Sequence, residues 1–376
     1  MASTSGVETN IASQAWYVNR IVPPGSGKTN LLLLRANYLA NTEHANLAVV
    51  VFNRTLREFI RAGGEHYNFD PDNVRTSRQF FDGLLAEAHV RFQEGSDFDV
   101  DRHRRLAALN DAIPDGRDAL FDVILLDEAQ DYLAGELQIF RRLAHNLFMV
   151  ADLRQQIYPG EPVQNALTGM VDRVLPLRFH YRSGQPICQI ADEIGKTFSA
   201  GYTPILPTCN YNSPELRPTV ELFNGDLEAQ ANEIANRLRL QRRAYPEALL
   251  GVICPRLAEV RAIADVLVAN GLADQLCIQD REDGYQPIQP GRSIWVSTVH
   301  SAKGLEFRAL HFAAAEYVKR FGAEQKRLAY TAVTRAKTSL VIYHQGALPG
   351  YLDAALNSIR PLGPSARDLG AAFGRR

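Results

Sequence analysis

A glycine-rich turn near the N-terminus constrains the fold of this chain more than any other feature. Gly25-Ser26-Gly27-Lys28-Thr29 follows the apolar run Trp16–Val22 and opens a helical pattern over Thr29–Leu39. Glycines at such a turn let backbone N–H groups converge on phosphate oxygens, and the helix N-terminus adds its dipole. The turn predicts a phosphate-binding loop, in which Lys28 neutralises the β- and γ-phosphates and Thr29 holds Mg²⁺.

A glycine turn with a surface lysine is the alternative for these residues. The phosphate-loop pattern wants a small residue at its first position, where this chain has Val22. The apolar strand and the helical pattern on either side favour the phosphate loop, because that motif requires both.

Two carboxylates end a second apolar run. Asp127 and Glu128 directly follow Val123–Leu126. The C-terminal ends of buried parallel strands form the edge at which such sheets bind ligands. There Asp127 can bind Mg²⁺, and Glu128 can polarise a water for attack on the γ-phosphate. An acidic surface turn is the alternative, but together with the phosphate loop the segment predicts nucleotide hydrolysis.

Strands and helices alternate in both halves of the chain. The expected strands are Trp16–Val22, Leu47–Phe52, Val123–Leu126, Leu147–Ala151, Val220–Phe223, Leu249–Cys254, Ile294–Val299, Ala309–Ala313 and Ser339–His344. Helices are expected after Gly184, over Leu227–Gln241 and over Leu257–Asn270, and the polar stretch Gln93–Arg105 is expected to be a surface excursion. This alternation predicts two parallel-sheet α/β domains, residues 1–175 and 176–360, followed by a flexible tail over 361–376.

Composition excludes several classes of protein. With 46% hydrophobic and 22% charged residues, the chain has the balance of an ordinary soluble protein with a real core. We find no apolar run near the roughly 18 residues that span a bilayer and no export signal, so we expect a cytoplasmic location and no membrane partner. Four cysteines lack metal-ligand spacing and are expected to be reduced thiols: Cys188, Cys209, Cys254 and Cys277.

The charge of the chain is unevenly distributed. Residues 1–175 hold 17 Lys and Arg against 23 Asp and Glu, a net of −6, and residues 176–376 hold 24 against 19, a net of +5. Since the sum is only −1, no global basic field attracts nucleic acid. Any such partner must be held by a local groove.

Five segments together resemble one known family. They are Asp127-Glu128-Ala129-Gln130-Asp131, Ala151–Tyr158, Tyr181-Arg182-Ser183, Thr298–Phe307 and Arg327–Ala336. In sequence and in order they resemble the superfamily 1 helicases of the UvrD, Rep and PcrA type. The late segments are the most specific, because a simple phosphate-loop kinase has no reason to contain them.

The resemblance implies two RecA-like domains with an ATP site in the cleft between them. Gln155 then corresponds to the γ-phosphate sensor, and Arg182 and Arg335 correspond to arginine fingers from the second domain. Guanidinium groups stabilise the charge of a phosphoryl transition state, although a structural ion pair is the alternative for each arginine. Tyr181 corresponds to the residue that stacks on adenine, and Glu306 to one that contacts the ribose.

The resemblance also implies a groove for single-stranded DNA. Phe52, Thr76 and His300 match positions that line this groove, with ordinary core packing as the alternative for each. Arg78 and Tyr158 complete the expected DNA-binding set.

The chain departs from the family pattern in four ways. The adenine-reading glutamine is missing at its usual spacing, where Gln14 is the nearest candidate, and Asn30 replaces an arginine that sandwiches adenine. Gly160 and Glu161 replace a Trp-Arg pair, which removes a base-stacking ring from the DNA site. The large accessory insertions are also absent, since only 45 residues separate Phe81 from Asp127.

Two functions of different classes follow. The first is an ATPase that moves 3′ to 5′ along single-stranded DNA, with RNA as a possible track. The second is a nucleotide-controlled binding or regulatory subunit that acts with a nuclease or another effector, for example in anti-phage defence. Both use ATP and Mg²⁺.

Overall fold

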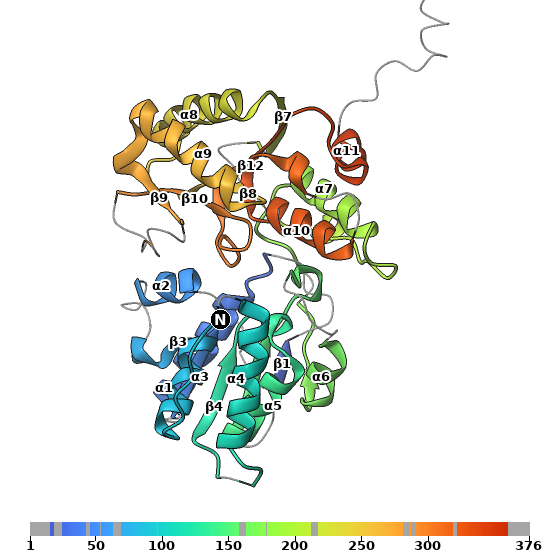
Figure 1. Cartoon of the computed structure of the whole chain (residues 1–376). Helices are drawn as coiled ribbons and strands as arrows, with labels where there is room; N and C mark the ends of the chain where they lie inside the picture. The colour runs from blue at the N-terminus through green and yellow to red at the C-terminus, as the bar shows by residue number, and fades with distance from the viewer. Residues whose placement is uncertain are drawn as a thin grey trace, which may run out of the picture.

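The computed structural model contains two α/β domains, one above the other in Figure 1, and each is built on a six-stranded sheet. It describes residues 16–18, 25–42, 46–52, 54–62, 69–95, 97–116, 118–157, 163–177, 179–211, 217–280, 286, 291–318 and 322–359. Every described strand pairing in both sheets is parallel. The expected pair of parallel-sheet α/β domains is confirmed.

The first sheet has the strand order β3-β2-β4-β5-β1-β6. Its strands are β1 (Trp16–Val18), β2 (Leu47–Val51), β3 (Val74–Thr76), β4 (Phe121–Leu126), β5 (Ala144–Val150) and β6 (Arg173–Val174). Its helices are α1 (Lys28–Thr42), α2 (Arg54–Ala62), α3 (Ser77–Glu87), α4 (Phe98–Ala112), α5 (Ala134–Leu143) and α6 (Gln164–Gly169). The sequence did not predict β3 and β6, which are too short to show a period.

The second sheet has the strand order β7-β12-β11-β8-β10-β9. Its strands are β7 (Thr219–Asn224), β8 (Leu250–Cys254), β9 (Leu276–Ile278), β10 (Ile294–Thr298), β11 (Phe307–Phe312) and β12 (Ala336–His344). Its helices are α7 (Gln185–Lys196), α8 (Leu227–Ala244), α9 (Leu257–Leu267), α10 (Ala323–Val333) and α11 (Gly350–Asn357). All five strands predicted for this half are present, and the short β9 was missed.

Helices cover both faces of the first sheet. Leu32 of α1 packs with Val49 on one face, and Phe80 and Phe140, from α3 and α5, belong to the core cluster that contains Val50 on the other. A parallel sheet buried in this way has near-continuous apolar strands, which is why the strands could be recognised in the sequence. The two-sided core holds the carboxyl ends of β2, β4 and β5 in fixed positions.

Some sequence predictions concern residues outside the described part of the chain. These are Gln14, Val22, Tyr158, Gly160, Glu161 and the tail 361–376. The domain boundary near residue 175 stays a prediction, while β6 ends at Val174 and α7 begins at Gln185. The four cysteines are free, and no helix within the described ranges is long and apolar enough to cross a membrane.

The prediction of a surface excursion over Gln93–Arg105 is wrong, because α4 begins at Phe98. Asp97 caps this helix by accepting hydrogen bonds from the backbone N–H groups of Asp99 and Val100, each at 3.0 Å. Three of its charged residues, Asp101, Arg102 and Arg105, are buried rather than solvated. Arg102 reaches Glu136 of α5, with 2.9 Å between Nε and Oε1, and also donates to the Asp131 carbonyl at 2.6 Å.

Replacing Arg102 with Met is expected to destabilise the first domain strongly. The change leaves the buried Glu136 carboxylate without its partner, and breaking a buried pair in this way costs about 3–5 kcal/mol. Urea denaturation should show this loss in the free energy of unfolding. Arg104→Met is the matched control, because Arg104 lies on the same helix with its side chain 54% exposed. A loss for Arg102→Met no larger than the control's would contradict the buried pair.

Candidate functional site

The glycine turn forms an open cradle at the start of α1. Gly25 and Gly27 have φ angles of 75° and 84°, in the region that favours glycine. A Cβ on Gly25 would lie 2.1 Å from the Cβ of Arg182, whereas a Cβ on Gly27 would meet nothing within 4 Å. The Ser26 hydroxyl is buried and makes no hydrogen bond to any described residue. The turn therefore fits a phosphate group, and the second domain approaches it at Gly25.

Two oxygen ligands of the kind that Mg²⁺ prefers lie beside this cradle. Thr29 Oγ1 donates to Asp127 Oδ2 at 2.7 Å, joining the start of α1 to the end of β4. Burial and the adjacent Glu128 carboxylate raise the pKa of Asp127 to about 6. A cation bound here would favour the ionised form of Asp127, so the donor pair fits a divalent metal.

Glu128 is held in a buried, oriented position. Its backbone has a φ of 49°, and its side chain accepts a hydrogen bond from Gln130 Nε2 at 2.5 Å. Burial opposes ionisation, but Lys303, Lys28 and Arg335 lower the pKa of Glu128 below its usual value. The carboxylate is therefore ionised at neutral pH, as a group that polarises water must be.

Lys28 is buried next to the same carboxylates. Its ammonium lies 3.7 Å from Asp152 Oδ2, at the end of β5. Burial lowers the pKa of Lys28, while Asp152 and Glu128 oppose this shift. Gln130 links the two strand ends, since its side-chain oxygen accepts the Asp152 backbone N–H at 2.9 Å. No role was predicted for Gln130 from the sequence.

Two cations of the second domain contact Gln155 of the first. Arg335 Nη2 donates to Gln155 Oε1 at 2.6 Å, and Lys303 Nζ donates to the Gln155 carbonyl at 2.5 Å. Lys303 also pairs with Asp131, at 2.5 Å, and both side chains are buried. Burial and the neighbouring Arg182 lower the pKa of Arg335 to about 10, so it stays a cation at neutral pH. Lys303 and Asp131 were missed, although both lie in segments that carried the family resemblance.

Arg182 belongs to the second domain and lies against the cradle at Gly25. Its guanidinium pairs with Glu306, whose other carboxylate oxygen is 2.9 Å from Lys337 Nζ. The Nε of Arg182 is buried without a hydrogen bond to any described residue. Burial opposes the shift, but Arg182 and Lys337 lower the pKa of Glu306 well below its usual range. Glu306, which the family resemblance predicts to contact the ribose, forms an ion pair with Arg182 in this structure.

Tyr181 is attached to the cradle through its backbone. Its N–H donates to the Gly25 carbonyl at 3.0 Å, and its side chain is 50% exposed beside the ring of Phe179. Asn30, three residues into α1, is also exposed. An exposed ring next to a phosphate cradle is suited to stacking on a base.

The described residues predicted to line a DNA groove make contacts within the protein. Phe52 makes an edge contact with Tyr132, at 5.6 Å between ring centroids, and Thr76 is buried and caps α3. Arg78 pairs with Asp82 and Glu94. Phe52, Thr76 and His300 follow or end β2, β3 and β10, so they share the carboxyl edges of the two sheets, and their DNA role stays a prediction.

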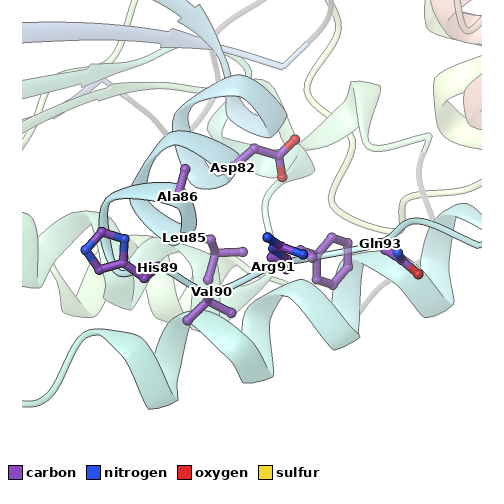
Figure 2. A pocket seen from close by; sticks show the side chains of 8 residues that line it. Asp82, Leu85, Ala86, His89, Val90, Arg91 and Gln93 are labelled. Carbon is purple, nitrogen blue, oxygen red and sulfur yellow. The ribbon is translucent and has the colours of Figure 1, made fainter.

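A separate pocket of about 720 Å³ lies at the end of α3 (Figure 2). It is lined by Asp82, Leu85, Ala86, His89, Val90, Arg91, Phe92 and Gln93. All of these residues lie in α3 or in the segment that follows it, and none belongs to the cradle or to the strand ends described above.

A comparison with known protein families matches one segment of the chain. Residues 293–343, from just before β10 into β12, match the UvrD-like helicase C-terminal domain. That segment contains both Lys303 and Arg335. No curated protein matches the chain.

Several solved helicase structures are similar to parts of the chain. The C-terminal domain of a possible DNA helicase from Lactobacillus plantarum WCFS1 is 24% identical over 46% of this chain and 91% of its own, with a TM-score of 0.34. The arterivirus nonstructural protein 10 helicase with DNA is 15% identical over 91% of this chain and 63% of its own, with a TM-score of 0.43. The helicase of PRRSV is 15% identical over 88% of this chain and 52% of its own, also with a TM-score of 0.43. The chain thus spans only part of the viral helicases, 63% and 52% of their lengths.

Proposed function

We propose that the chain hydrolyses ATP to move along single-stranded DNA, in the 3′ to 5′ direction, and the match of residues 293–343 to the UvrD-like helicase C-terminal domain supports this. The main support is one contact across the domains, the hydrogen bond of 2.6 Å from Arg335 to Gln155. It joins a cation of the second domain to the predicted phosphate sensor of the first.

In this proposal the cradle binds the triphosphate of ATP. The backbone of Gly25, Ser26 and Gly27 faces the phosphates, Lys28 neutralises their charge, and Tyr181 stacks on the base. Thr29 and Asp127 would hold Mg²⁺, which supplies charge neutralisation to the β- and γ-phosphates when bound. Asn30 lies next to this set and offers no guanidinium for the base, so stacking is the main contact that the base receives.

The hydrolysis step uses residues of both domains. Glu128 orients a water and takes its proton while the water oxygen bonds to the γ-phosphorus. The bond from that phosphorus to the bridging oxygen breaks, which yields ADP and phosphate. Arg182 and Arg335 stabilise the charge that develops on the transferred group.

Movement follows from the contacts of Gln155. Gln155, the proposed γ-phosphate sensor, accepts hydrogen bonds from Lys303 and Arg335 of the second domain. Loss of the γ-phosphate would therefore alter these contacts between the domains. Opening and closing of the cleft would then advance the second domain along the strand. The carboxyl edges near Phe52, Thr76 and His300 would form the DNA path, with Arg78 at its flank.

Single-stranded DNA is expected to stimulate steady-state ATP hydrolysis. The proposed path crosses the same two domains that form the ATP site, so binding of a strand favours the closed arrangement in which both arginines are placed. Phosphate release should be measured with and without an oligodeoxynucleotide, with Glu128→Gln as the blank. An oligoribonucleotide arm separates DNA from RNA as the track.

Slow ATP hydrolysis that no nucleic acid stimulates would contradict the proposed movement along DNA. It would favour the second candidate, a nucleotide-controlled subunit that docks on a nuclease or another effector. The replacement of a Trp-Arg pair by Gly160 and Glu161 is the observation that supports this alternative.

A further inference from the structure

The carboxyl edge of the second sheet carries an exposed tyrosine stacked against an arginine. Arg256 lies over the ring of Tyr317, with 3.4 Å from its guanidinium carbon to the ring centroid. Tyr317 is 41% exposed, and the Arg256 side chain is 52% exposed. From β7 to α11, no other aromatic side chain among the described residues is classed as exposed.

The strand order places this pair and His300 at the same edge of the sheet. In the parallel pairing of β8 with β10, Cys254 lies opposite Thr298, and both strands end there. Arg256 and His300 each lie two residues beyond these strand ends. Tyr317 lies five residues beyond the end of β11, which pairs with β8 on its other side. Tyr317, Arg256 and His300 therefore belong to turns that follow three successive strands of the sheet, β11, β8 and β10.

This edge faces the first domain. Lys303 lies just beyond the carboxyl end of β10 and pairs with Asp131 of the first domain. A polymer that passes His300 between the domains would next meet the turns that carry Arg256 and Tyr317, beyond the ends of β8 and β11.

The turn that presents Tyr317 is rigidly held. Ala314 has a φ of 54°, which side chains other than glycine rarely adopt, and its N–H donates to the buried Gln230 side chain at 3.0 Å. Tyr317 N–H then donates to the Ala314 carbonyl at 3.1 Å, and the next residue, Val318, is fully buried. Strained turns that the surrounding structure supports occur preferentially at functional sites.

We propose that Tyr317, supported from behind by Arg256, is a stacking platform for one base of the bound single strand. The inference rests on the proposed function and adds a contact to it. Arg256 is also paired with Glu259, so it contributes a stacking surface more than net charge. In the resembling helicases a Trp ring stacks on a base at the position of Gly160. In this chain Tyr317 would supply such a ring from the second domain.

Binding of oligonucleotides to the full chain tests the platform. Fluorescence anisotropy should be measured with an oligothymidine of about 20 nucleotides, longer than the roughly 4–16 that comparable sites cover. An abasic sugar-phosphate strand of the same length and an oligouridine form the other arms. Tyr317→Ala is expected to weaken binding of the oligothymidine about five- to hundredfold, the range found when base–aromatic stacking is removed.

The pattern across arms and variants identifies the contact as stacking. Tyr317→Ala should leave the abasic strand and the salt dependence of binding unchanged, because the ring carries no charge. Tyr317→Phe should bind the oligothymidine like the wild type. Oligouridine should show the same loss, since uracil also offers a flat face.

A tyrosine elsewhere in the chain is the matched control. Tyr38 on α1 is 46% exposed with Arg35 over its ring, but it lies ten residues, or about 15 Å, along the helix from Lys28. Tyr38→Ala should leave DNA affinity unchanged. Equal oligothymidine affinity for the wild type and Tyr317→Ala, or equal losses on the oligothymidine and abasic strands, would overturn the platform while leaving the motor intact. A wild-type chain that binds none of the strands would overturn the proposed function, and the platform with it.

Discussion

Glu128→Gln is expected to lower steady-state ATP hydrolysis by about 10²–10⁴-fold, the usual contribution of a group that takes a proton in the transition state. The variant should still bind ATP, because Lys28 and the cradle remain intact. Glutamine has nearly the same shape, and the Gln130 amide can still donate to its side-chain oxygen, so the local fold should be kept. Phosphate release and binding of a fluorescent ATP analogue measure the two effects separately.

Lys28→Ala is the companion change. It removes the cation that faces the phosphates and leaves Asp152 without its partner at 3.7 Å. Hydrolysis should again be lost, and here nucleotide binding should weaken as well. Normal turnover in either variant would overturn the assignment of this site.

Arg335→Ala is expected to lower the turnover number by about 10³–10⁵-fold with little change in ATP affinity. The guanidinium is buried and reaches the first domain at Gln155, so it is placed to act on charge that develops during the reaction. Arg335→Lys should restore little, because an ammonium cannot reproduce the planar fork of donors. Turnover should be measured at saturating ATP, and affinity by nucleotide binding in a Glu128→Gln background.

Two outcomes would change the role given to Arg335. A collapse of ATP affinity in Arg335→Ala would make it a ground-state binder instead of a transition-state group. Unchanged turnover would leave it as a structural contact of Gln155. The melting temperature serves as the control, since the lost hydrogen bond leaves a buried amide that costs about 1–3 kcal/mol.

The strands, helices and phosphate loop of this protein could be predicted because their signals are local. Buried parallel strands are near-continuous apolar runs, and the chemistry of a phosphate loop lies within five consecutive residues, Gly25 to Thr29. The same reasoning failed for α4, where Arg102 and Arg105 looked solvated. A charged residue can be buried only if a partner meets it, and Glu136, 34 residues away, is not visible in a local pattern.

The sequence by itself determined the two parallel sheets, the cradle, and the carboxylates Asp127 and Glu128 at the end of β4. Tertiary structure alone decided which side chains meet across the domains. Gln155 and Arg335 are 180 residues apart, and Lys303 and Asp131 are 172 apart. The stacked pair of Arg256 and Tyr317 likewise depends on β8 and β11 becoming neighbours. Such contacts depend on strand order and domain placement, which arise from packing of the whole core and not from any short segment.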